Sequence, residues 1–329
     1  MDDTKTSLPK MLVVLNPKGG QADPVTLQQA LDRNCRPEEW QVRVYRVKDG
    51  EDLGAEVRAA VRERYEVVAA AGGDGTVAAV ANALIGTGVP LAILPVGTGN
   101  ALARELALPL SLDRACALIA GEHQIRVIDV MQVGEHYCIL NVSAGLSAIS
   151  MRETTGESKQ RYGMLAYILT ALRGLAGFQA RRYELEVDGL PISARASDVL
   201  VVNGSTPVAS LRRTGPSLQL DDGMLGVYVI RARTLLDYLA SVWVMLWRLE
   251  GRDRRVRVYD ARATVKLDAS PTAVLQADGD ALGETPVTIK LVRQALNVIV
   301  PPPTFDPLAE AGAMIDRVRR QGGLRRSGG

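Results

Sequence analysis

Cysteine and histidine are scarce in this sequence. Its 329 residues include three cysteines, Cys35, Cys116 and Cys138, and two histidines, His123 and His136. Because the cysteines lie far apart and only two histidines are present, no spacing typical of a structural zinc site can be written. An odd number of widely separated cysteines favours a reducing compartment, so we expect a cytoplasmic protein.

The sequence also lacks long hydrophobic runs and a strong net charge. Its first ten residues, MDDTKTSLPK, are acidic and polar, whereas a secretion signal begins basic and continues apolar. The apolar stretches 164–178 and 235–249 are too short to span a membrane, and each contains a charge, Arg173 or Asp237. A net charge of +2 gives no reason to expect nucleic acid as a partner. We therefore expect contact with a membrane only as a peripheral protein, at the inner face of the membrane.

Residues 8–125 alternate short apolar runs with amphipathic stretches. The runs MLVVL, QVRVYRV, YEVVAAA and PLAILPV are typical of buried strands, and residues 24–34, 51–64 and 76–85 are predicted helices between them. Repeated β–α units form parallel sheets with helices on their faces. The pattern therefore predicts an N-terminal α/β domain with a parallel sheet.

Residues 126–303 have a different rhythm. Many short strands separated by turn residues, such as RYELEVDG and MLGVYVI, predict a C-terminal antiparallel domain resembling a β-sandwich. Two helical segments, 163–177 and 235–250, interrupt it, and its last strand can return to the first domain. An edge strand of this domain offers a surface for a homodimer. Residues 304–329 are basic and glycine-rich, and we expect a partly disordered tail there.

Three predicted strands end in glycine-rich turns, at 19–20, 72–76 and 97–100. The carboxyl ends of parallel strands lie at one edge of a sheet, so these turns should line one anion-binding crevice. The chain contains no GxxxxGK[ST] phosphate loop. Residues 73–78 fit GxGxxA, the dinucleotide pattern of dehydrogenases, but follow a later strand and lack the acidic residue expected about 20 positions on.

Five motifs occur together in one order: LNPKGG, AGGDGT, LPVGTGN, DDGML and QADGD. In order and spacing the chain resembles the diacylglycerol kinase catalytic-domain family, which includes bacterial lipid kinases and sphingosine kinases. GGDGT alone is shared with NAD kinases, whereas GGDGT followed by P-x-GT-x-N is more specific. The resemblance extends over residues 10–301. It implies an ATP- and Mg²⁺-dependent kinase that phosphorylates a hydroxyl of diacylglycerol or a related lipid in a cleft between the two domains.

The resemblance also implies the nucleotide contacts. They fall on Asn16, Tyr45, Gly72, Gly73, Asp74, Gly75, Thr76, Val77, Thr98 and Asn100. Tyr45 stands where the family often has threonine. Asp74 has two interpretations that the sequence leaves open, since an aspartate here can cap the following helix or take part in a metal or phosphate network.

A Mg²⁺ loop and a catalytic base follow from the same resemblance. The loop would use the Asp222 carboxylate with the main-chain carbonyls of Gln219 and Met224, although Asp-Asp-Gly is also a common hairpin turn. Asp280 matches the final acid of the family's Q-x-D-G-E motif, the proton acceptor, and Asp278 is the alternative base. An ordinary β-turn is the structural interpretation of both aspartates.

Departures from the family pattern keep a second function open. Ala79 and Ala101 replace acids that are usual in the family, and Asp280 is one methylene shorter than the usual glutamate, a difference of about 1.5 Å. Such a displacement of a base can cost about a hundredfold in rate. The alternative is a catalytically weak or inactive nucleotide- or lipid-binding relative with a regulatory role.

The segment 235–250 is apolar and aromatic, and arginines follow it. It contains Trp243 and Trp247, and the following basic residues are Arg248, Arg252, Arg254, Arg255 and Arg257. Apolar faces with aromatic and basic flanks suit an anionic membrane surface, where a kinase would collect a lipid substrate. The alternative is that this segment and 163–177 cover the core while the arginines are solvated.

Overall fold

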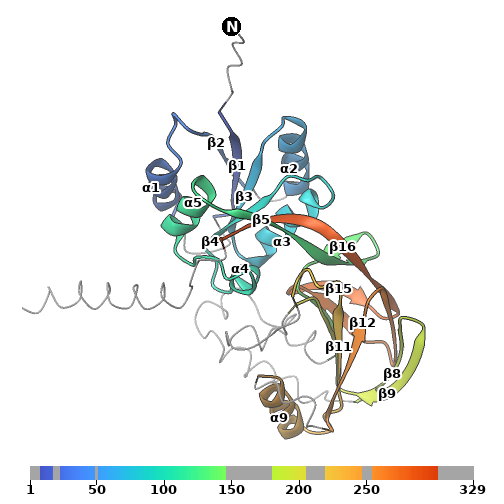
Figure 1. The fold of residues 1–329 in the computed structure, drawn as a ribbon. Helices are drawn as coiled ribbons and strands as arrows, with labels where there is room; N and C mark the ends of the chain where they lie inside the picture. Colours follow the sequence, from blue (N-terminus) through green and yellow to red (C-terminus); the bar gives the residue numbers. More distant parts are fainter. Residues whose placement is uncertain are drawn as a thin grey trace, which may run out of the picture.

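A computed structural model describes residues 8–17, 23–48, 51–145, 180–204, 219–246 and 254–302 of the chain. Within these residues the strands form two sheets, one of ten strands and one of six (Figure 1). The predicted helix 163–177, the glycine turn at 19–20 and the tail 304–329 lie outside the described residues. No helix of the described part of the chain is long and apolar enough to cross a membrane.

The N-terminal half of the ten-stranded sheet is parallel, in the order β2-β1-β3-β4. Its strands are β1 (Lys10–Leu15), β2 (Gln41–Arg46), β3 (Val67–Gly72) and β4 (Leu91–Pro95). β1, β3 and β4 are apolar in sequence because helices cover both faces of this part of the sheet. The edge strand β2 differs from the expected buried strand, because its residues alternate between exposed and partly buried. The helices are α1 (Pro24–Asn34), α2 (Leu53–Arg62), α3 (Asp74–Leu84), α4 (Ala101–Glu105) and α5 (Leu112–Ala120).

The helices divide between the two faces of the sheet according to the alternation of the strand residues. Met11 and Val13 of β1 pack with α1 and α5, whereas Leu12 and Val14 pack with α2, α3 and α4. The register of the parallel strands brings their carboxyl ends together, because Leu15 lies beside both Arg46 and Ala71. The turns that follow these strands therefore meet at one edge of the sheet.

A long last strand, β16 (Val287–Val300), continues the same sheet into the C-terminal half. Near the end of β16, Val298 pairs in parallel with Leu91 of β4, and near its start β16 pairs in antiparallel with β13 (Thr264–Ser270). The strands joined in this way are β5 (Gln124–Val133), β6 (His136–Cys138), β8 (Arg181–Val187), β9 (Leu190–Ala196) and β13 (Thr264–Ser270). One sheet thus runs through both halves, and the domain boundaries at 125 and 303 stay a prediction.

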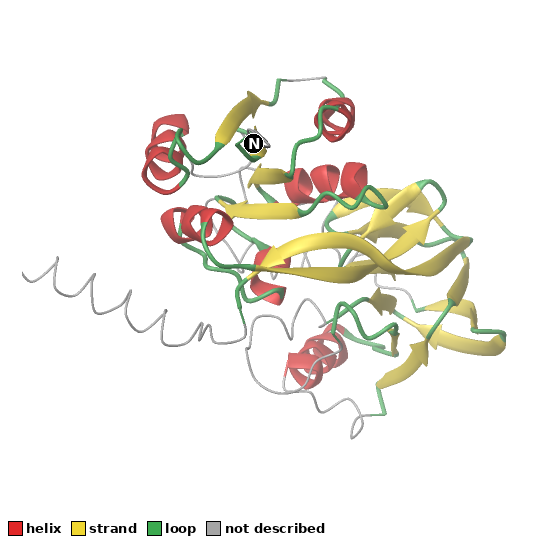
Figure 2. Ribbon diagram, turned by 45° about the horizontal axis from the view of Figure 1, so that its top comes forward, coloured by secondary structure: helices red, strands yellow, loops and turns green. Residues whose placement is uncertain are grey.

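The six-stranded sheet is antiparallel and has the order β12-β11-β10-β7-β14-β15. Its strands are β7 (Asn141–Gly145), β10 (Asp198–Val202), β11 (Leu225–Ile230), β12 (Val256–Ala261), β14 (Val274–Ala277) and β15 (Asp280–Glu284). One face packs against the ten-stranded sheet through a buried aliphatic cluster, and helix α9 (Leu235–Leu246) lies on the other face (Figure 2). The expected fold class, a parallel α/β part followed by an antiparallel sandwich-like part, is confirmed.

Candidate active site

The glycine turns after β3 and β4 pack directly on one another. A Cβ at Gly97 would lie 2.7 Å from the Gly73 Cα, and a Cβ at Gly72 would lie 2.5 Å from the Thr76 Oγ1. Both distances are shorter than any real Cβ contact, so these two positions require glycine. The structure thus joins two of the three predicted turns at the edge of the sheet.

Helix α3 begins in this junction and points its N-terminus into it. The main-chain N–H groups of Thr76 and Val77 bond to the Gly73 carbonyl, at 3.0 and 3.1 Å. Among the described residues, the N–H groups of Asp74 and Gly75 have no hydrogen-bond acceptor. Free N–H groups at a helix N-terminus are suited to bind an anion such as a phosphate.

Asp74 reaches across to the neighbouring turn and does not cap its own helix. Its Oδ1 accepts a hydrogen bond from the Ala101 N–H at 2.6 Å, which holds the start of α4. A Cβ at Gly99 would lie 2.3 Å from the Asp74 Oδ2, so the carboxylate occupies the space that this glycine leaves. The Asp74 carboxylate therefore does not cap α3, because the Thr76 and Val77 N–H groups bond to the Gly73 carbonyl and the carboxylate bonds to Ala101 instead.

Two further predicted contacts support the junction from within. The Asn16 Nδ2, directly after β1, donates to the Thr76 Oγ1 at 3.0 Å and so connects the end of β1 to the first turn of α3. Val77 has its side chain in the core beneath α3. Since the Val77 N–H is also bonded, its part in a nucleotide site would be structural.

The turn after β4 is closed by Asn100. Its Nδ2 donates to the Gly97 carbonyl at 2.7 Å, its Oδ1 accepts from the Gly97 N–H at 3.1 Å, and its backbone is left-handed, with φ of +50°. Thr98 is exposed at the tip of this turn. Tyr45 lies at the end of β2, where its hydroxyl bonds to Glu51 and this bond raises the Tyr45 pKa.

The turn between β14 and β15 contains both candidate bases, and the structure separates their roles. Asp278 accepts three main-chain hydrogen bonds, from Ile139 at 2.6 Å and from Leu140 and Asn141 at 2.9 Å each. Burial raises the Asp278 pKa, against the lowering effect of these bonds. Asp278 therefore anchors its turn to the segment that leads into β7.

Asp280 is exposed and lies against the N-terminus of α3. A Cβ at Gly75 would be 4.0 Å from the Asp280 Oδ2, so the two motifs meet although Gly75 and Asp280 are 205 positions apart in the chain. A cavity of about 180 Å³ lies at this meeting point. Its lining residues are Gly75, Ala78, Ala79, Asn82, His136, Tyr137, Cys138, Ala277, Asp278, Asp280 and Leu282.

Asn82 bridges the two walls of this cavity. Its Nδ2 donates to the Tyr137 carbonyl at 2.9 Å and its Oδ1 accepts from the Tyr137 N–H at 3.0 Å, which ties α3 to β6. His136, on the same strand, lines the cavity, and the sequence gave no signal for that position.

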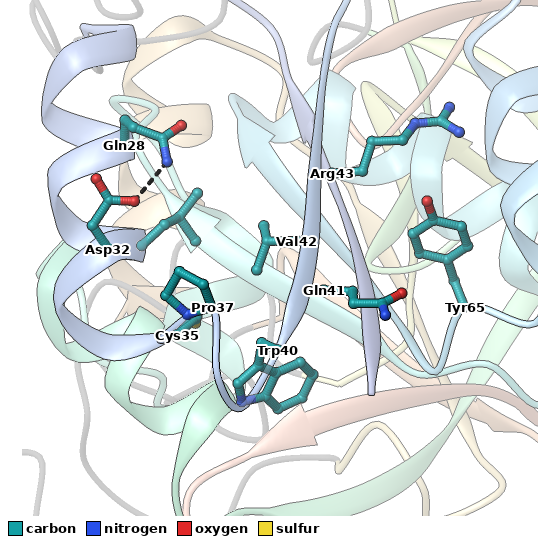
Figure 3. A pocket seen from close by; sticks show the side chains of 10 residues that line it. Gln28, Asp32, Cys35, Pro37, Trp40, Gln41, Val42, Arg43 and Tyr65 are labelled. Carbon is teal, nitrogen blue, oxygen red and sulfur yellow. Dashed lines mark hydrogen bonds between the residues drawn. The ribbon is translucent and has the colours of Figure 1, made fainter. Parts of the chain in front are cut away.

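A larger cavity of about 410 Å³ lies elsewhere, beside the edge strand β2 (Figure 3). Gln28 and Asp32, which are hydrogen-bonded to each other, lie on one side of it, and Arg43 and Tyr65 lie on the other. None of the predicted site residues lines it. We place the candidate active site at the smaller cavity because that one joins motifs from both halves.

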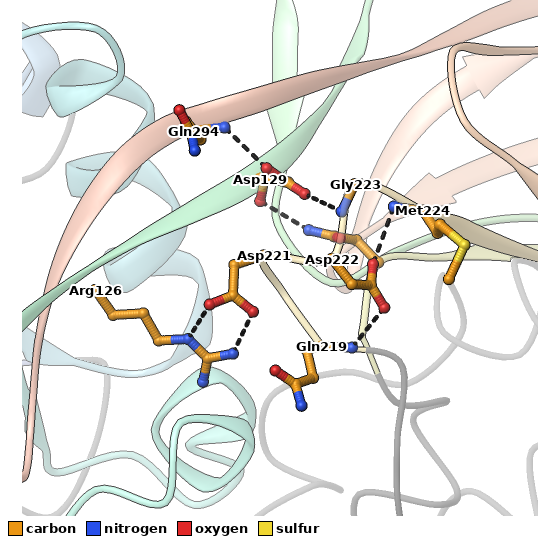
Figure 4. A network of polar contacts seen from close by, with 9 residues as sticks. Arg126, Asp129, Gln219, Asp221, Asp222, Gly223, Met224 and Gln294 are labelled. Atoms are coloured by element: carbon orange, nitrogen blue, oxygen red, sulfur yellow. Dashed lines mark hydrogen bonds and ion pairs between the residues drawn. The ribbon is translucent and has the colours of Figure 1, made fainter. Parts of the chain in front are cut away.

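The predicted Mg²⁺ loop is a compact turn organised by Asp222 (Figure 4). The Asp222 carboxylate accepts the Gln219 N–H and the Met224 N–H, both at 2.9 Å, and is exposed at the surface. A carboxylate and main-chain carbonyls are hard oxygen ligands of the kind that Mg²⁺ prefers. No group of three or more acidic, histidine or cysteine side chains in the described part of the chain could hold a metal, so an ion here would depend on carbonyls. The geometry of this segment fits both the metal loop and the hairpin turn.

Sequence reasoning missed Asp129, the buried centre of the same network. Its Oδ2 accepts from the Gly223 N–H and its Oδ1 from the Gln294 N–H, both at 2.8 Å, and its own N–H donates to the Leu220 carbonyl at 2.6 Å. Figure 4 shows this carboxylate between the loop and β16. An acid within the apolar strand IRVIDVMQV was the available signal, since a buried carboxylate requires partners.

Comparison with known families agrees with this arrangement. Residues 10–133 match the family described as Diacylglycerol kinase catalytic domain, and residues 140–300 match the YegS C-terminal NAD kinase beta sandwich-like domain. The two matches together cover most of the chain. The chain belongs to the diacylglycerol kinase catalytic-domain family of lipid kinases. The resemblance carried by the glycine and aspartate motifs is therefore confirmed.

Individual relatives are distant but extensive. Diacylglycerol kinase from Bacillus subtilis (strain 168) is 27% identical over 256 residues, which are 77% of this chain and 83% of that protein. Probable lipid kinase YegS from Escherichia fergusonii is 28% identical over 301 residues, which are 90% of this chain and 97% of that protein. A longer relative from Synechocystis sp. is 29% identical over 242 residues, and this chain covers 54% of its length.

A solved structure shows the same fold. The crystal structure of a protein from Bacillus anthracis strain Sterne superposes with a TM-score of 0.74 at 23% sequence identity. The superposition covers 93% of this chain and 99% of that one, so the similarity includes both halves.

Proposed function

We propose that this protein is an ATP- and Mg²⁺-dependent lipid kinase that transfers the γ-phosphate to a hydroxyl of diacylglycerol or a related lipid. The observation that carries the proposal is the position of the Asp280 carboxylate against Gly75 at the N-terminus of α3. Phosphoryl transfer requires a phosphate held in place beside a group that accepts a proton. The cavity between α3 and the β14–β15 turn brings such groups together.

The nucleotide phosphates would bind to main-chain N–H groups at the sheet edge. The glycines at 72, 73 and 97 let the two turns pack closely, and Asp74 fixes their relative position through Ala101. The free N–H groups at Asp74 and Gly75 supply hydrogen bonds and the positive end of the α3 dipole. The residues lining the cavity include no lysine or arginine that would duplicate this role.

Asp280 is the proposed proton acceptor, and Asp278 holds it in position. In the proposed step the lipid hydroxyl oxygen bonds to the γ-phosphorus, the bond from that phosphorus to the β–γ bridging oxygen breaks, and ADP leaves. The hydroxyl proton passes to the Asp280 carboxylate. Asp278 is a poor candidate for this task because three main-chain N–H groups already bond to its two oxygens.

Mg²⁺ would be held through Asp222 with the carbonyls of Gln219 and Met224, and it would supply neutralisation of phosphate charge. The exposed carboxylate has free lone pairs beside its two N–H partners, so this set fits the ion. Asp129 holds the loop that carries these groups.

The test measures transfer of labelled γ-phosphate from ATP to lipids in mixed micelles, with the intact protein, Asp280→Asn and Asp222→Asn. We expect phosphorylated diacylglycerol or a related lipid with the intact protein and a loss of at least a hundredfold in kcat for Asp280→Asn. ATP binding, followed by calorimetry, should survive in Asp280→Asn because the amide has nearly the shape of the carboxylate.

Two outcomes would reject the proposal. Label on no lipid, with ATP still bound, would indicate the binding relative, and Ala79 in the cavity wall would then be a candidate cause. Binding of NADH but not of ATP would indicate a dehydrogenase-like site instead. Full activity in Asp280→Asn would still indicate a kinase but would show that Asp280 is not its base.

A further inference from the structure

Helix α9 has one face on the core and one face in solvent. Tyr238 packs against an aliphatic cluster on the outer face of the six-stranded sheet, and its hydroxyl donates to the buried Asp198 at 3.2 Å. Leu236 and Trp243 are 77% and 59% exposed. They stand seven positions apart, with Ala240 between them, so they lie on one side of the helix, opposite Tyr238. The core-cover interpretation therefore does not account for Leu236 and Trp243.

Arginines surround the N-terminal end of this helix. The Arg231 N–H bonds to the Arg255 carbonyl at 2.7 Å, which brings the segment before α9 beside the segment before β12. Arg233 and Arg254, on these two segments, are exposed, and Arg255 lies 3.6 Å from Asp237. An exposed apolar stripe thus continues into a positively charged end. Trp247, Arg248 and Arg252 of the same sequence pattern lie outside the described residues.

We propose that α9 docks on an anionic lipid surface, with Leu236 and Trp243 inserted between the lipids and Arg233 and Arg254 against the headgroups. Charge complementarity selects this occupant, because a basic end beside a leucine and a tryptophan matches the composition of helices that lie in the membrane interface. Each arginine near an anionic surface strengthens binding about fivefold. The proposal deepens the proposed function, since it identifies the surface through which the enzyme would approach its lipid.

The position of α9 in the fold agrees with such a role. The helix lies at the end of the molecule away from the N-terminal helices (Figure 1), and the catalytic residues are not on it. Docking would hold the enzyme at the bilayer without occupying its cleft. Loss of docking should therefore raise the apparent KM for lipid in vesicles and leave kcat on a soluble lipid unchanged.

The test is cosedimentation of the full chain, without ATP, with vesicles of phosphatidylcholine alone or mixed with phosphatidylglycerol. The variants are Leu236→Ser with Trp243→Ser, and Arg233→Gln with Arg254→Gln. Matched controls are Leu190→Ser and Arg195→Gln, because both residues are exposed at the β8–β9 hairpin. Circular dichroism and thermal unfolding establish that each variant is folded.

We expect binding to the mixed vesicles that weakens with salt, a loss of at least tenfold in each α9 double variant, and no change in the controls. Binding of the double variants equal to that of the intact protein would overturn the proposal, as would self-association through α9 in sedimentation velocity without vesicle binding. Turnover of monomeric dioctanoylglycerol, measured separately, tests the kinase. Vesicle binding without turnover would reject the proposed function and keep the docking surface.

Discussion

At the scale of single residues, the β14–β15 turn shows two aspartates with different environments. Asp278 is enclosed by main-chain N–H groups, and Asp280, two positions later, is exposed beside Gly75. The resemblance of the motif favoured Asp280 as the base with Asp278 as the alternative, but nothing in the sequence distinguished the two carboxylates physically. Three main-chain bonds give Asp278 an anchoring role, and the exposed Asp280 carboxylate is the proposed proton acceptor.

Asp278→Asn should destabilise the protein more than it alters the chemistry. An amide presents one acceptor and one donor group, so at least one of the three N–H donors that now bond to Asp278 would lose its acceptor. An unsatisfied buried donor costs about 1–3 kcal/mol. Urea unfolding measures this cost, and Asp280→Asn is the matched control, expected to unfold like the intact protein. Equal stability of both variants would contradict the anchoring role.

At the scale of elements, the structure depends on side chains that join segments far apart in the sequence. Asn82 ties α3 to β6, Asp74 ties α3 to α4, and Asp129 ties β5 to the turn before β11 and to β16. At Asp129 the pairing of β5 with β16 is irregular between Val292 and Leu296, and Gln294 there has φ of +50°. The carboxylate satisfies the N–H that the irregular pairing leaves.

Asp129→Ala should weaken both the fold and Mg²⁺ binding. It would leave the N–H groups of Gly223 and Gln294 without acceptors, at about 1–3 kcal/mol each. Because Gly223 lies inside the proposed Mg²⁺ loop, we also expect at least tenfold weaker Mg²⁺ binding. Urea unfolding and a Mg²⁺ titration of ATP turnover measure the two effects.

The control for this variant is Asp221→Asn in the same loop. It breaks the ion pair with Arg126. The side chains of both partners are about one-third exposed, so this pair should contribute less than about 1 kcal/mol to the free energy of unfolding. A Mg²⁺ affinity that stays the same in Asp129→Ala would separate Asp129 from the ion site and leave it a purely structural role.

At the scale of the whole molecule, the ten-stranded sheet joins the two halves. β16 pairs with β4 of the first half and with β13 of the second, so the halves share a backbone hydrogen-bond network. The thiols of Cys35, Cys116 and Cys138 are distributed over this structure, and all three are buried and free. Because all three thiols are buried, their ionisation depends on whether the protein is folded.

Burial should make the protein sensitive to alkali. It raises the thiol pKa to about 11 for Cys35 and to about 12 for Cys116 and Cys138. Between pH 9 and these values the unfolded chain has released protons that the folded protein keeps, so the free energy of unfolding falls as pH rises. Each thiol contributes at most about 1.4 kcal/mol per pH unit.

Urea unfolding at pH 7, 9 and 10 tests this dependence, with Cys116→Ala as the comparison. The variant lacks one of the three thiols, so its stability should decline less steeply above pH 9, whatever its stability at pH 7. Parallel declines in both proteins would show that the Cys116 thiol does not contribute, and rapid reaction of native thiols with a disulfide reagent at pH 8 would contradict their burial.

The sequence by itself determined the fold class and the location of the chemistry. Strand periodicity predicted the parallel and antiparallel parts, and the order of the glycine and aspartate motifs predicted the family. These features are local, because a strand followed by a glycine turn and a helix places N–H groups in the same way wherever it occurs. The turns after β3 and β4 therefore met as expected.

Only the tertiary structure decided which residues act on one another across long separations. The sheet shared by both halves, the bond from the Ala101 N–H to Asp74, the different environments of Asp278 and Asp280, and the central place of Asp129 all depend on contacts between distant segments. A carboxylate bonds to whichever N–H groups packing brings within about 3 Å, and packing depends on the whole chain. The sequence therefore indicated where the candidate active site lies, and the tertiary structure showed which of its residues contact one another.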